Sequence, residues 1–107
     1  MIEFFAKAGD TRPIETKCQD AEGPVNLTGA SVKFRYRNVS GGEAVVRDAE
    51  ITAAATGDVK YEFQEDELVA GSYESEWLVI LTDGQKATFP TDQYIYLRVF
   101  EALTSQP

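Results

Sequence analysis

Four carboxylates close together in the sequence are the side chains most able to do chemistry in this chain. They are Glu62, Glu65, Asp66 and Glu67. Calcium prefers many oxygen ligands, so a calcium site is one interpretation, although the sequence has no Asp-x-Asp-x-Asp-Gly loop. Paired carboxylates can also hydrolyse glycosides, but that chemistry needs a cleft and a fixed separation, for which short strands offer no evident place. We interpret the group as a solvated acidic turn.

The hydroxyl and thiol side chains lack partners that would activate them. Ser72, Ser75 and Thr88 have no histidine to act as base, because the sequence contains none, and no lysine is evidently placed to replace it. A zinc site is equally unsupported, since histidine and several cysteines are its usual ligands. The single Cys18 cannot form an intrachain disulfide and is expected to be a buried, small hydrophobic side chain. The sequence therefore predicts a protein that is not an enzyme, with no catalytic residues, no metal and no cofactor.

Length and charge narrow the class of protein further. The chain has 107 residues, with 10 lysines and arginines against 18 aspartates and glutamates, for a formal net charge of −8. A nucleic-acid-binding protein needs a basic surface, so we expect no nucleic-acid partner. No apolar run approaches the roughly 20 residues of a membrane-spanning helix, so we expect no membrane contact. Glu3 and Lys7 interrupt the first apolar stretch, whereas the apolar region of a signal peptide is continuous. We therefore expect a protein that is made in a cytoplasm and is not secreted by means of a signal peptide.

Alternation of apolar and polar residues at period two dominates the sequence. It predicts clear strands at residues 30–37, 58–63, 72–81 and 94–100. Weaker strands are expected at 2–6, 13–18, 43–54 and 86–89, and the one helix candidate is a single turn within 64–70. Glycine-containing turns separate these runs, including a hairpin at Asp83-Gly84. Seven to nine short strands predict an all-β, immunoglobulin-like antiparallel β-sandwich that forms one domain over residues 1–103, with a frayed tail at 104–107.

Aromatic and β-branched residues on one side of these strands form the expected core. Residues 69–75 contain a glycine and a tyrosine spaced as in the tyrosine corner of immunoglobulin domains, with Tyr73 at the corner. Ser75 takes the place of the second disulfide cysteine, and Trp77 follows on the same face as Tyr73. Without a disulfide, burial of large aromatic side chains is a physical substitute. The predicted core residues are Val32, Phe34, Tyr61, Phe63, Tyr73 and Trp77.

Residues on the other side of the strands are candidates for protein contacts. Lys33, Arg35 and Arg37 form a basic row, which is either a docking stripe for an acidic neighbour or paired across strands with Glu74 and Glu76. The last strand carries aromatics opposite its apolar side, which is typical of an interface unless both faces are covered within the domain or the register differs. Together with the open edges of a sandwich, these features favour a homo-oligomer. The interface candidates are Phe4, Phe5, Lys33, Arg35, Arg37, Tyr94, Tyr96, Arg98 and Phe100.

Five segments resemble, in order and spacing, a known phage domain. They are residues 9–13, 20–34, 56–61, 70–77 and 83–90, and they include Glu22-Gly23-Pro24, Gly71-Ser72-Tyr73 and Asp83-Gly84. Together they resemble the immunoglobulin-like N-terminal domain of siphophage baseplate upper proteins and related phage tail proteins. The resemblance covers nearly the whole chain.

This resemblance implies a structural virion protein of a tailed bacteriophage, namely an adaptor or assembly subunit of the tail, baseplate or neck. It would be made in the host bacterial cytoplasm, reside in the virion, and contact other phage structural proteins within a homo-oligomer or ring. Such relatives continue into a longer chain, whereas this sequence ends at Pro107, so we expect an adaptor, ring or decoration subunit rather than direct receptor attachment. The alternatives are a capsid decoration protein and a host-surface carbohydrate-binding module with exposed tyrosine and tryptophan.

Overall fold

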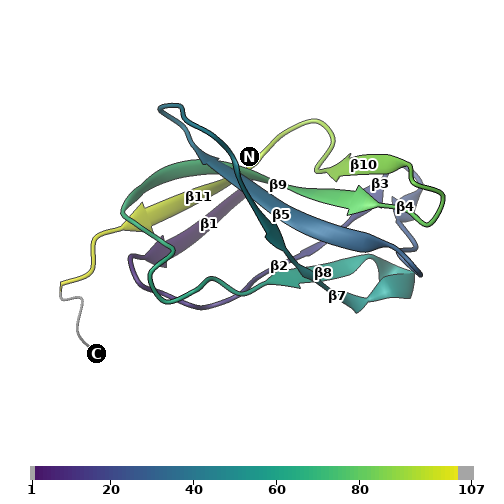
Figure 1. The fold of residues 1–107 in the computed structure, drawn as a ribbon, viewed down its shortest axis with the longest axis horizontal. Helices are drawn as coiled ribbons and strands as arrows, with labels where there is room; N and C mark the ends of the chain where they lie inside the picture. Colours follow the sequence, from purple (N-terminus) through teal and green to yellow (C-terminus); the bar gives the residue numbers. More distant parts are fainter. Residues whose placement is uncertain (1, 104–107) are drawn as a thin grey trace.

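The structure is a computed structural model that describes residues 2–103, and it confirms the predicted all-β sandwich (Figure 1). The expected tail at 104–107 lies outside the described residues. The strands are β1 (Ile2–Lys7), β2 (Ile14–Lys17), β3 (Gln19–Asp20), β4 (Gly23–Pro24), β5 (Ser31–Asn38), β6 (Val45–Asp48), β7 (Glu50–Ala53), β8 (Asp58–Tyr61), β9 (Gly71–Ile80), β10 (Lys86–Phe89) and β11 (Ile95–Phe100), with a 3-10 turn, η1 (Ala54–Thr56), between β7 and β8.

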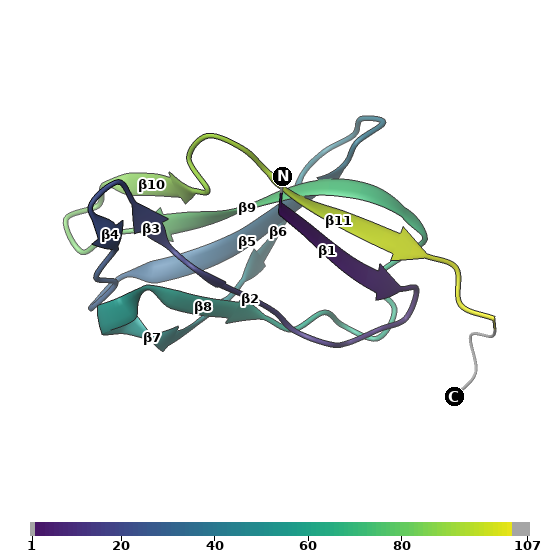
Figure 2. The same ribbon diagram turned by 180° about the vertical axis from the view of Figure 1, so that it is seen from behind.

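Two main sheets form the layers of the sandwich. The larger sheet has the order β1-β11-β9-β5-β6, and β10 also pairs with β9. The smaller sheet has the order β2-β8-β7, and Figure 1 shows β7 and β8 below β5 and β9. The short β3 and β4 pair with each other at one end, as Figure 2 shows from behind. The proline before β2 indicated an edge strand, and β2 does lie at an edge of its sheet.

One strand pair departs from the predicted antiparallel pattern. β1 runs parallel to β11, with Phe5 opposite Arg98 and Lys7 opposite Phe100. Two strands joined by a tight hairpin must be antiparallel, but β1 continues into β2 of the other sheet and so escapes that constraint. This places the first and last strands of the described chain side by side and makes β1 an edge of the larger sheet.

The core lies between the sheets and is built on aromatic rings. Trp77 on β9 and Phe34 on β5 are completely buried, with ring centroids 4.7 Å apart. Phe34 also stacks on Tyr61 of β8 at 5.2 Å, which joins the larger sheet to the smaller one. Five of the six predicted core residues are buried, and Tyr73 is half-buried at the margin. Other buried side chains in the same core include Leu27, Ile95, Leu97 and Val59.

The predicted tyrosine corner is confirmed at the start of β9. The hydroxyl of Tyr73 donates a hydrogen bond of 2.8 Å to the carbonyl oxygen of Val69, four residues upstream. Gly71 between them has φ 150°, a conformation that L side chains rarely adopt. Ser75, in the place of a disulfide cysteine, donates through Oγ to the Ile95 carbonyl oxygen at 2.7 Å. The position of the second disulfide cysteine is therefore used here for a hydrogen bond between two strands of the larger sheet, and not for a link between the sheets.

Two segments differ from the expectations drawn from the sequence. Residues 64–70 contain a turn and no helix, because the inward-directed Glu67 closes a local loop with Gln64. The expected strand at 43–54 is divided at Ala49, where the chain leaves the larger sheet after β6 and enters the smaller one as β7. Within residues 2–103, no helix has the length and apolar character needed to cross a membrane.

The 3-10 turn η1 ends at a position that only glycine can occupy. Gly57 has φ 75°, and a Cβ there would lie 2.5 Å from the Cys18 carbonyl oxygen. The same two residues are joined by a hydrogen bond of 2.7 Å from the Cys18 N–H to the Gly57 carbonyl oxygen. Close approach of the two backbones therefore fixes the end of β2 against the start of β8.

Substitution of the corner tyrosine tests whether its hydroxyl stabilises the fold. We expect Tyr73→Phe to lower the free energy of unfolding by about 0.5–1.5 kcal/mol, because it removes one hydrogen bond to a backbone carbonyl. Urea denaturation followed by Trp77 fluorescence measures this change. Tyr96→Phe is the matched control, since its ring lies on the outer face, and it should change stability by less than about 0.5 kcal/mol. Equal effects of the two substitutions would contradict a role for the corner bond.

Candidate interaction surface

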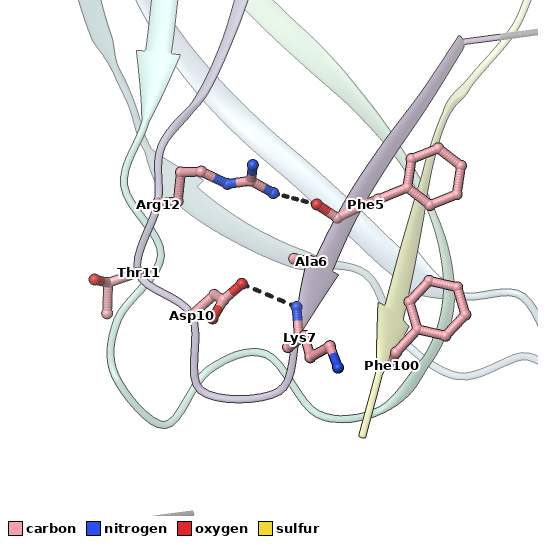
Figure 3. Close-up of a pocket in the computed structure, with 7 residues that line it drawn as sticks. All are labelled: Phe5, Ala6, Lys7, Asp10, Thr11, Arg12 and Phe100. Carbon is pink, nitrogen blue, oxygen red and sulfur yellow. Dashed lines mark hydrogen bonds between the residues drawn. The ribbon is translucent and has the colours of Figure 1, made fainter. Parts of the chain in front are cut away.

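The outer side of β1 and β11 carries an aromatic pair among the interface candidates. Alternate residues of β11 face the core, which leaves Phe100 on the outer side of the sheet. Phe5 on β1 lies beside it (Figure 3). The ring centroids are 6.4 Å apart and the ring planes meet at 10°. Phe5 keeps 53% and Phe100 55% of their surface exposed. The two rings therefore form an ordered apolar patch in contact with solvent.

A second group of candidates continues this surface along β11. The guanidinium carbon of Arg98 lies 5.5 Å from the ring centre of Tyr96, and Tyr94 meets Tyr96 edge-on at 6.4 Å. Arg98 Nε donates to a carboxylate oxygen of Glu3 on β1 at 3.1 Å, and Nη1 donates to Ser72 Oγ on β9 at 3.2 Å. Partners on both neighbouring strands thus hold Arg98 in one position, and Arg98 in turn covers the Tyr96 ring.

Phe4, which the sequence analysis grouped with Phe5, lies on the opposite side of β1. Its ring is half-buried and lies 6.0 Å from that of the core residue Phe63. The guanidinium carbon of Arg12 lies 5.0 Å from the centre of the Phe4 ring. The period of two explains this separation, because successive residues of a strand point to opposite faces. The structure therefore places Phe4 with the core and not with the outer aromatic surface.

The free edge of β1 is partly closed by the segment that follows it. The Lys7 N–H donates to Asp10 Oδ2 at 2.9 Å, and the Asp10 N–H donates to the Lys7 carbonyl oxygen at 3.0 Å. The Arg12 guanidinium donates to the Phe5 carbonyl oxygen (Figure 3). A shallow open hollow of about 490 Å³ lies here, lined in part by Phe5, Phe100 and Arg12. Backbone groups that could pair with an added strand are thereby occupied along half of β1.

The basic row on β5 is neutralised within the outer face. Each of its three cations forms an ion pair with a carboxylate on a neighbouring strand. The pairs are Lys33–Asp48, Arg35–Glu76 and Arg37–Glu74. The hydrogen bond and charge of Glu74 raise the pKa of Arg37, and those of Lys33 lower the pKa of Asp48. The cross-strand pairing with Glu74 and Glu76 that we considered as the alternative is present, and a docking role for the row stays a prediction.

One member of the acidic cluster is not solvated as expected. The Glu67 side chain is only 6% exposed, and it accepts hydrogen bonds from the hydroxyls of Tyr36 and Tyr61, the latter at 2.7 Å. The Gln64 N–H donates to Glu67 Oε1 at 2.9 Å, and Arg47 Nε lies 3.6 Å from Oε2. A carboxylate with four partners costs little to bury, since its oxygens are satisfied. Glu67 therefore pins the 62–70 segment to β5 and β8.

The sequence contained a signal for the contacts of Glu67 with Tyr36 and Tyr61, and the alternation of apolar and polar residues does not include it. Tyr36 and Tyr61 both fall on the inward side of their strands, and buried tyrosine hydroxyls need a hydrogen-bond partner. A carboxylate in a nearby turn is a natural acceptor for two such donors. The pattern could not say which of the four carboxylates would serve, because that depends on the path of the turn.

Two of the remaining candidates for chemistry, Cys18 and Glu62, are respectively buried and paired with a cation. Cys18 is completely buried, and burial together with the charge of Asp58 raises the pKa of its thiol to about 11. Glu62 pairs with Lys60 at 3.3 Å at the surface. In the part of the chain that the structure describes, no group of three or more histidine, cysteine, aspartate or glutamate side chains is placed to hold a metal ion.

Removal of the buried carboxylate tests its role in holding the turn. We expect Glu67→Ala to lower the free energy of unfolding by about 1–3 kcal/mol, because it leaves two tyrosine hydroxyls and one N–H without their acceptor. Glu65→Ala, an exposed carboxylate in the same turn, is the matched control and should cost less than about 0.5 kcal/mol. Chemical denaturation of both variants measures the two free energies of unfolding. Similar decreases in the two variants would contradict a specific role of Glu67 in holding the turn.

The stability of the protein at alkaline pH tests the same hydrogen bonds through the ionisation of Tyr61. Burial, followed by the hydrogen bond and charge of Glu67, raises the pKa of Tyr61 above its ordinary value of 10.0. As the pH rises, the tyrosine therefore loses its proton in the unfolded chain before it does so in the folded one. Its contribution to the free energy of unfolding is complete below about pH 10 and declines above it. Tyr61→Phe removes this contribution, and its free energy of unfolding should decline less steeply above about pH 10 than that of the wild type. Urea denaturation followed by circular dichroism at a series of pH values gives the free energy of unfolding of both proteins. Equal slopes against pH would contradict a raised pKa of Tyr61 in the folded state.

Comparison with known proteins supports the fold and little more. No protein-family model matches the sequence, and no curated protein matches it. Among solved structures, the crystal structure of CopC from Methylosinus trichosporium OB3b is similar, with a TM-score of 0.55 and 18% sequence identity over 92% of this chain and 85% of that one. At this level of identity the likeness shows the β-sandwich fold alone.

The resemblance to siphophage baseplate upper proteins is therefore wrong. No family or curated match supports it, and the solved structure reported above as similar is CopC and not a phage tail protein. The expected virion function and virion location rested on that resemblance and are wrong with it, as is the capsid decoration alternative. The host-surface carbohydrate-binding alternative required an exposed tryptophan, and Trp77 is completely buried. The physical reason is that the matching motifs serve any sandwich. Gly84 closes a turn with Leu81 at 2.9 Å, and Tyr73 forms a corner, whatever the protein binds.

Proposed function

We propose that this protein is a non-catalytic binding module that holds a protein partner on the outer face of β1 and β11. The observation that carries the proposal is the stacked pair of Phe5 and Phe100, each just over half exposed on one face of the larger sheet. Exposed apolar groups of this size on an ordered sheet face are a feature of interaction sites. The proposal keeps the contact surface inferred from the sequence and none of the phage identity.

The composition of this surface supports a protein partner. Phe5, Tyr96, Arg98 and Phe100 are of the residue types enriched in the centres of protein interfaces, where tyrosine and arginine are frequent hot spots. The contacts of Arg98 with Glu3, Ser72 and the Tyr96 ring fix the side chains before any partner arrives. Such preorganisation reduces the entropy lost on binding, because few rotamers remain to be frozen.

The partner is expected to lie on the face of β1 rather than along its edge. Asp10 and Arg12 occupy backbone groups of Lys7 and Phe5 at that edge, and a strand added there would have to displace them. Side chains on the face are free of that restriction. Contacts in this proposal are therefore between side chains, and strand addition to the sheet plays no part.

The chemistry of the remaining side chains supports a role without catalysis. The Ser75 hydroxyl is engaged with the Ile95 carbonyl oxygen, and the Cys18 thiol is buried with a raised pKa. Zinc, copper and iron sites draw on imidazole and accessible thiolate ligands, and this sequence has no histidine and one cysteine. These residues favour a protein that acts by binding a partner through a complementary surface, without catalysis.

Photo-crosslinking from the aromatic pair tests the proposal. We expect Phe100→p-benzoylphenylalanine to form a defined protein adduct in an extract of the source cells, because the ring belongs to the exposed aromatic pair that carries the proposal. Val69→p-benzoylphenylalanine is the control, since Val69 is an exposed apolar residue outside this face, and it should give no such adduct. Gel electrophoresis and mass spectrometry identify the product.

Competition decides whether the adduct reports the proposed surface. Excess unlabelled wild-type chain should suppress the adduct, whereas excess Phe5→Ser/Phe100→Ser chain should not, because it lacks both rings. The proposal is contradicted if no adduct is specific to position 100, or if both competitors suppress it equally.

A further inference from the structure

We infer that the partner on this face is an acidic segment of another protein, in which a bulky apolar side chain lies next to at least one carboxylate. This inference rests on the proposed function and names the chemistry of its partner. It is drawn from the way in which cations and carboxylates are paired on the outer face of the larger sheet, and from the position of Lys7 beside the phenylalanine pair.

The outer face carries positive charge in a chain that is acidic overall. Strand alternation and register place six cations and four carboxylates on this face, which gives it a charge of +2, whereas the whole chain carries −8. A face whose sign is opposite to that of the rest of the molecule favours a negatively charged partner. The six cations are Lys7, Lys33, Arg35, Arg37, Lys86 and Arg98. The four carboxylates are Glu3, Asp48, Glu74 and Glu76.

Ion pairs within the face account for four of these cations. Each of the four carboxylates pairs with a different cation, in the pairs Lys33–Asp48, Arg35–Glu76, Arg37–Glu74 and Arg98–Glu3. Among residues 2–103, no carboxylate lies within ion-pair distance of the ammonium groups of Lys7 and Lys86, and both lysines are exposed. The positive charge of the face is therefore located at these two lysines.

Of these two lysines, Lys7 lies beside the aromatic pair and Lys86 lies at the other end of the sheet. Lys7 is the register neighbour of Phe100 and lines the same hollow as Phe5 and Phe100 (Figure 3). Lys86 lies opposite Ile80 at the end of β9, whereas the end of β11 lies beside the start of β9, so roughly 30 Å of strand separates the two lysines. Unpaired positive charge and exposed apolar rings therefore coincide at Lys7.

The segment that follows β1 adds a second cation to the hollow. Arg12 is exposed and lines the hollow together with Lys7, and its guanidinium contacts the Phe5 carbonyl oxygen and the Phe4 ring. Asp10 also lines the hollow, where its carboxylate accepts a hydrogen bond from the Lys7 N–H. Two cations and one carboxylate give the described lining a net positive charge.

The spacing of these groups determines which side chains the partner presents. Neighbouring strands lie about 4.8 Å apart, so the side chains of Lys7 and Phe100 lie close together at the surface. An apolar side chain of the partner that packs on the two rings therefore brings the residues next to it to the Lys7 ammonium. A carboxylate at that place is attracted to Lys7 at the margin of the apolar contact, whereas a lysine or arginine is repelled.

Charge variants of the crosslinking chain test the sign of the partner. We expect Lys7→Glu in the Phe100→p-benzoylphenylalanine chain to raise the chain concentration that gives half-maximal adduct by about tenfold, because it replaces an attraction by a repulsion. Lys86→Glu is the matched control, since it makes the same change of net charge on the same face. It should raise that concentration by less than about twofold, because charges farther apart than a Debye length are screened.

Two further variants separate the charge of Lys7 from the structure of the edge. Lys7→Glu brings a carboxylate near Asp10, so we also use Lys7→Gln, which should raise the half-maximal concentration by about three- to fivefold. Lys7→Arg keeps the charge and should leave that concentration unchanged. Urea denaturation verifies that each variant is folded. Mass spectrometry of the adduct identifies the crosslinked segment, which should contain more aspartate and glutamate than lysine and arginine.

The outcomes distinguish this inference from the proposed function. The acidic partner is overturned if Lys7→Glu and Lys86→Glu have equal effects, if the crosslinked segment is neutral or basic, or if the adduct joins two copies of this chain through their outer faces. If the adduct is then still specific to position 100 and is suppressed by the wild-type competitor alone, the proposed function stands with a partner of other chemistry. If no such adduct forms, both are contradicted.

Discussion

The pairing of β5 with β9 determines both faces of this molecule. One antiparallel register places Phe34 opposite Trp77 and, one residue further along, Arg35 opposite Glu76. Because strand side chains alternate, the same register puts the two rings in the core and the ion pair on the surface. A slip by one residue would exchange the two sets and place charge in the core, so aromatic packing protects the pattern of the outer face.

The buried carboxylate of Glu67 has a comparable role at one end of the sandwich. It accepts hydrogen bonds from Tyr36 of β5 and Tyr61 of β8, which belong to opposite sheets. The segment that carries Glu67 leads directly into the corner of Tyr73 at the start of β9. The turn is therefore anchored at both of its ends, by a carboxylate on one side and by a tyrosine hydroxyl on the other. This accounts for an ordered connection in a segment whose sequence is mostly acidic.

Local patterns in the sequence were sufficient for the strands, the core and the corner. Period-two alternation places Val32 and Trp77 inside, and the spacing of Gly71 and Tyr73 identifies the corner, because both signals depend on nearest neighbours. The parallel pairing of β1 with β11 joins strands at the two ends of the described chain, and no local pattern encodes it. The choice of Glu67 among four carboxylates likewise depends on tertiary position. Turn motifs misled the family assignment, since glycine and proline at turns report backbone geometry and not ancestry.

The position of β1 explains why association is assigned to a face and not to an edge. An edge strand exposes the backbone N–H and C=O groups on its outer side, and these groups can pair with a strand of another chain. Here the chain turns back at Gly9, and the residues that follow occupy the groups of Lys7 and Phe5. Partial closure of the edge in this way favours side chains as the means of contact, and side chains can be specific where backbone pairing cannot. The pairing of β1 with β11 places Phe5 beside Phe100, so the strand whose edge is partly closed also builds the aromatic surface.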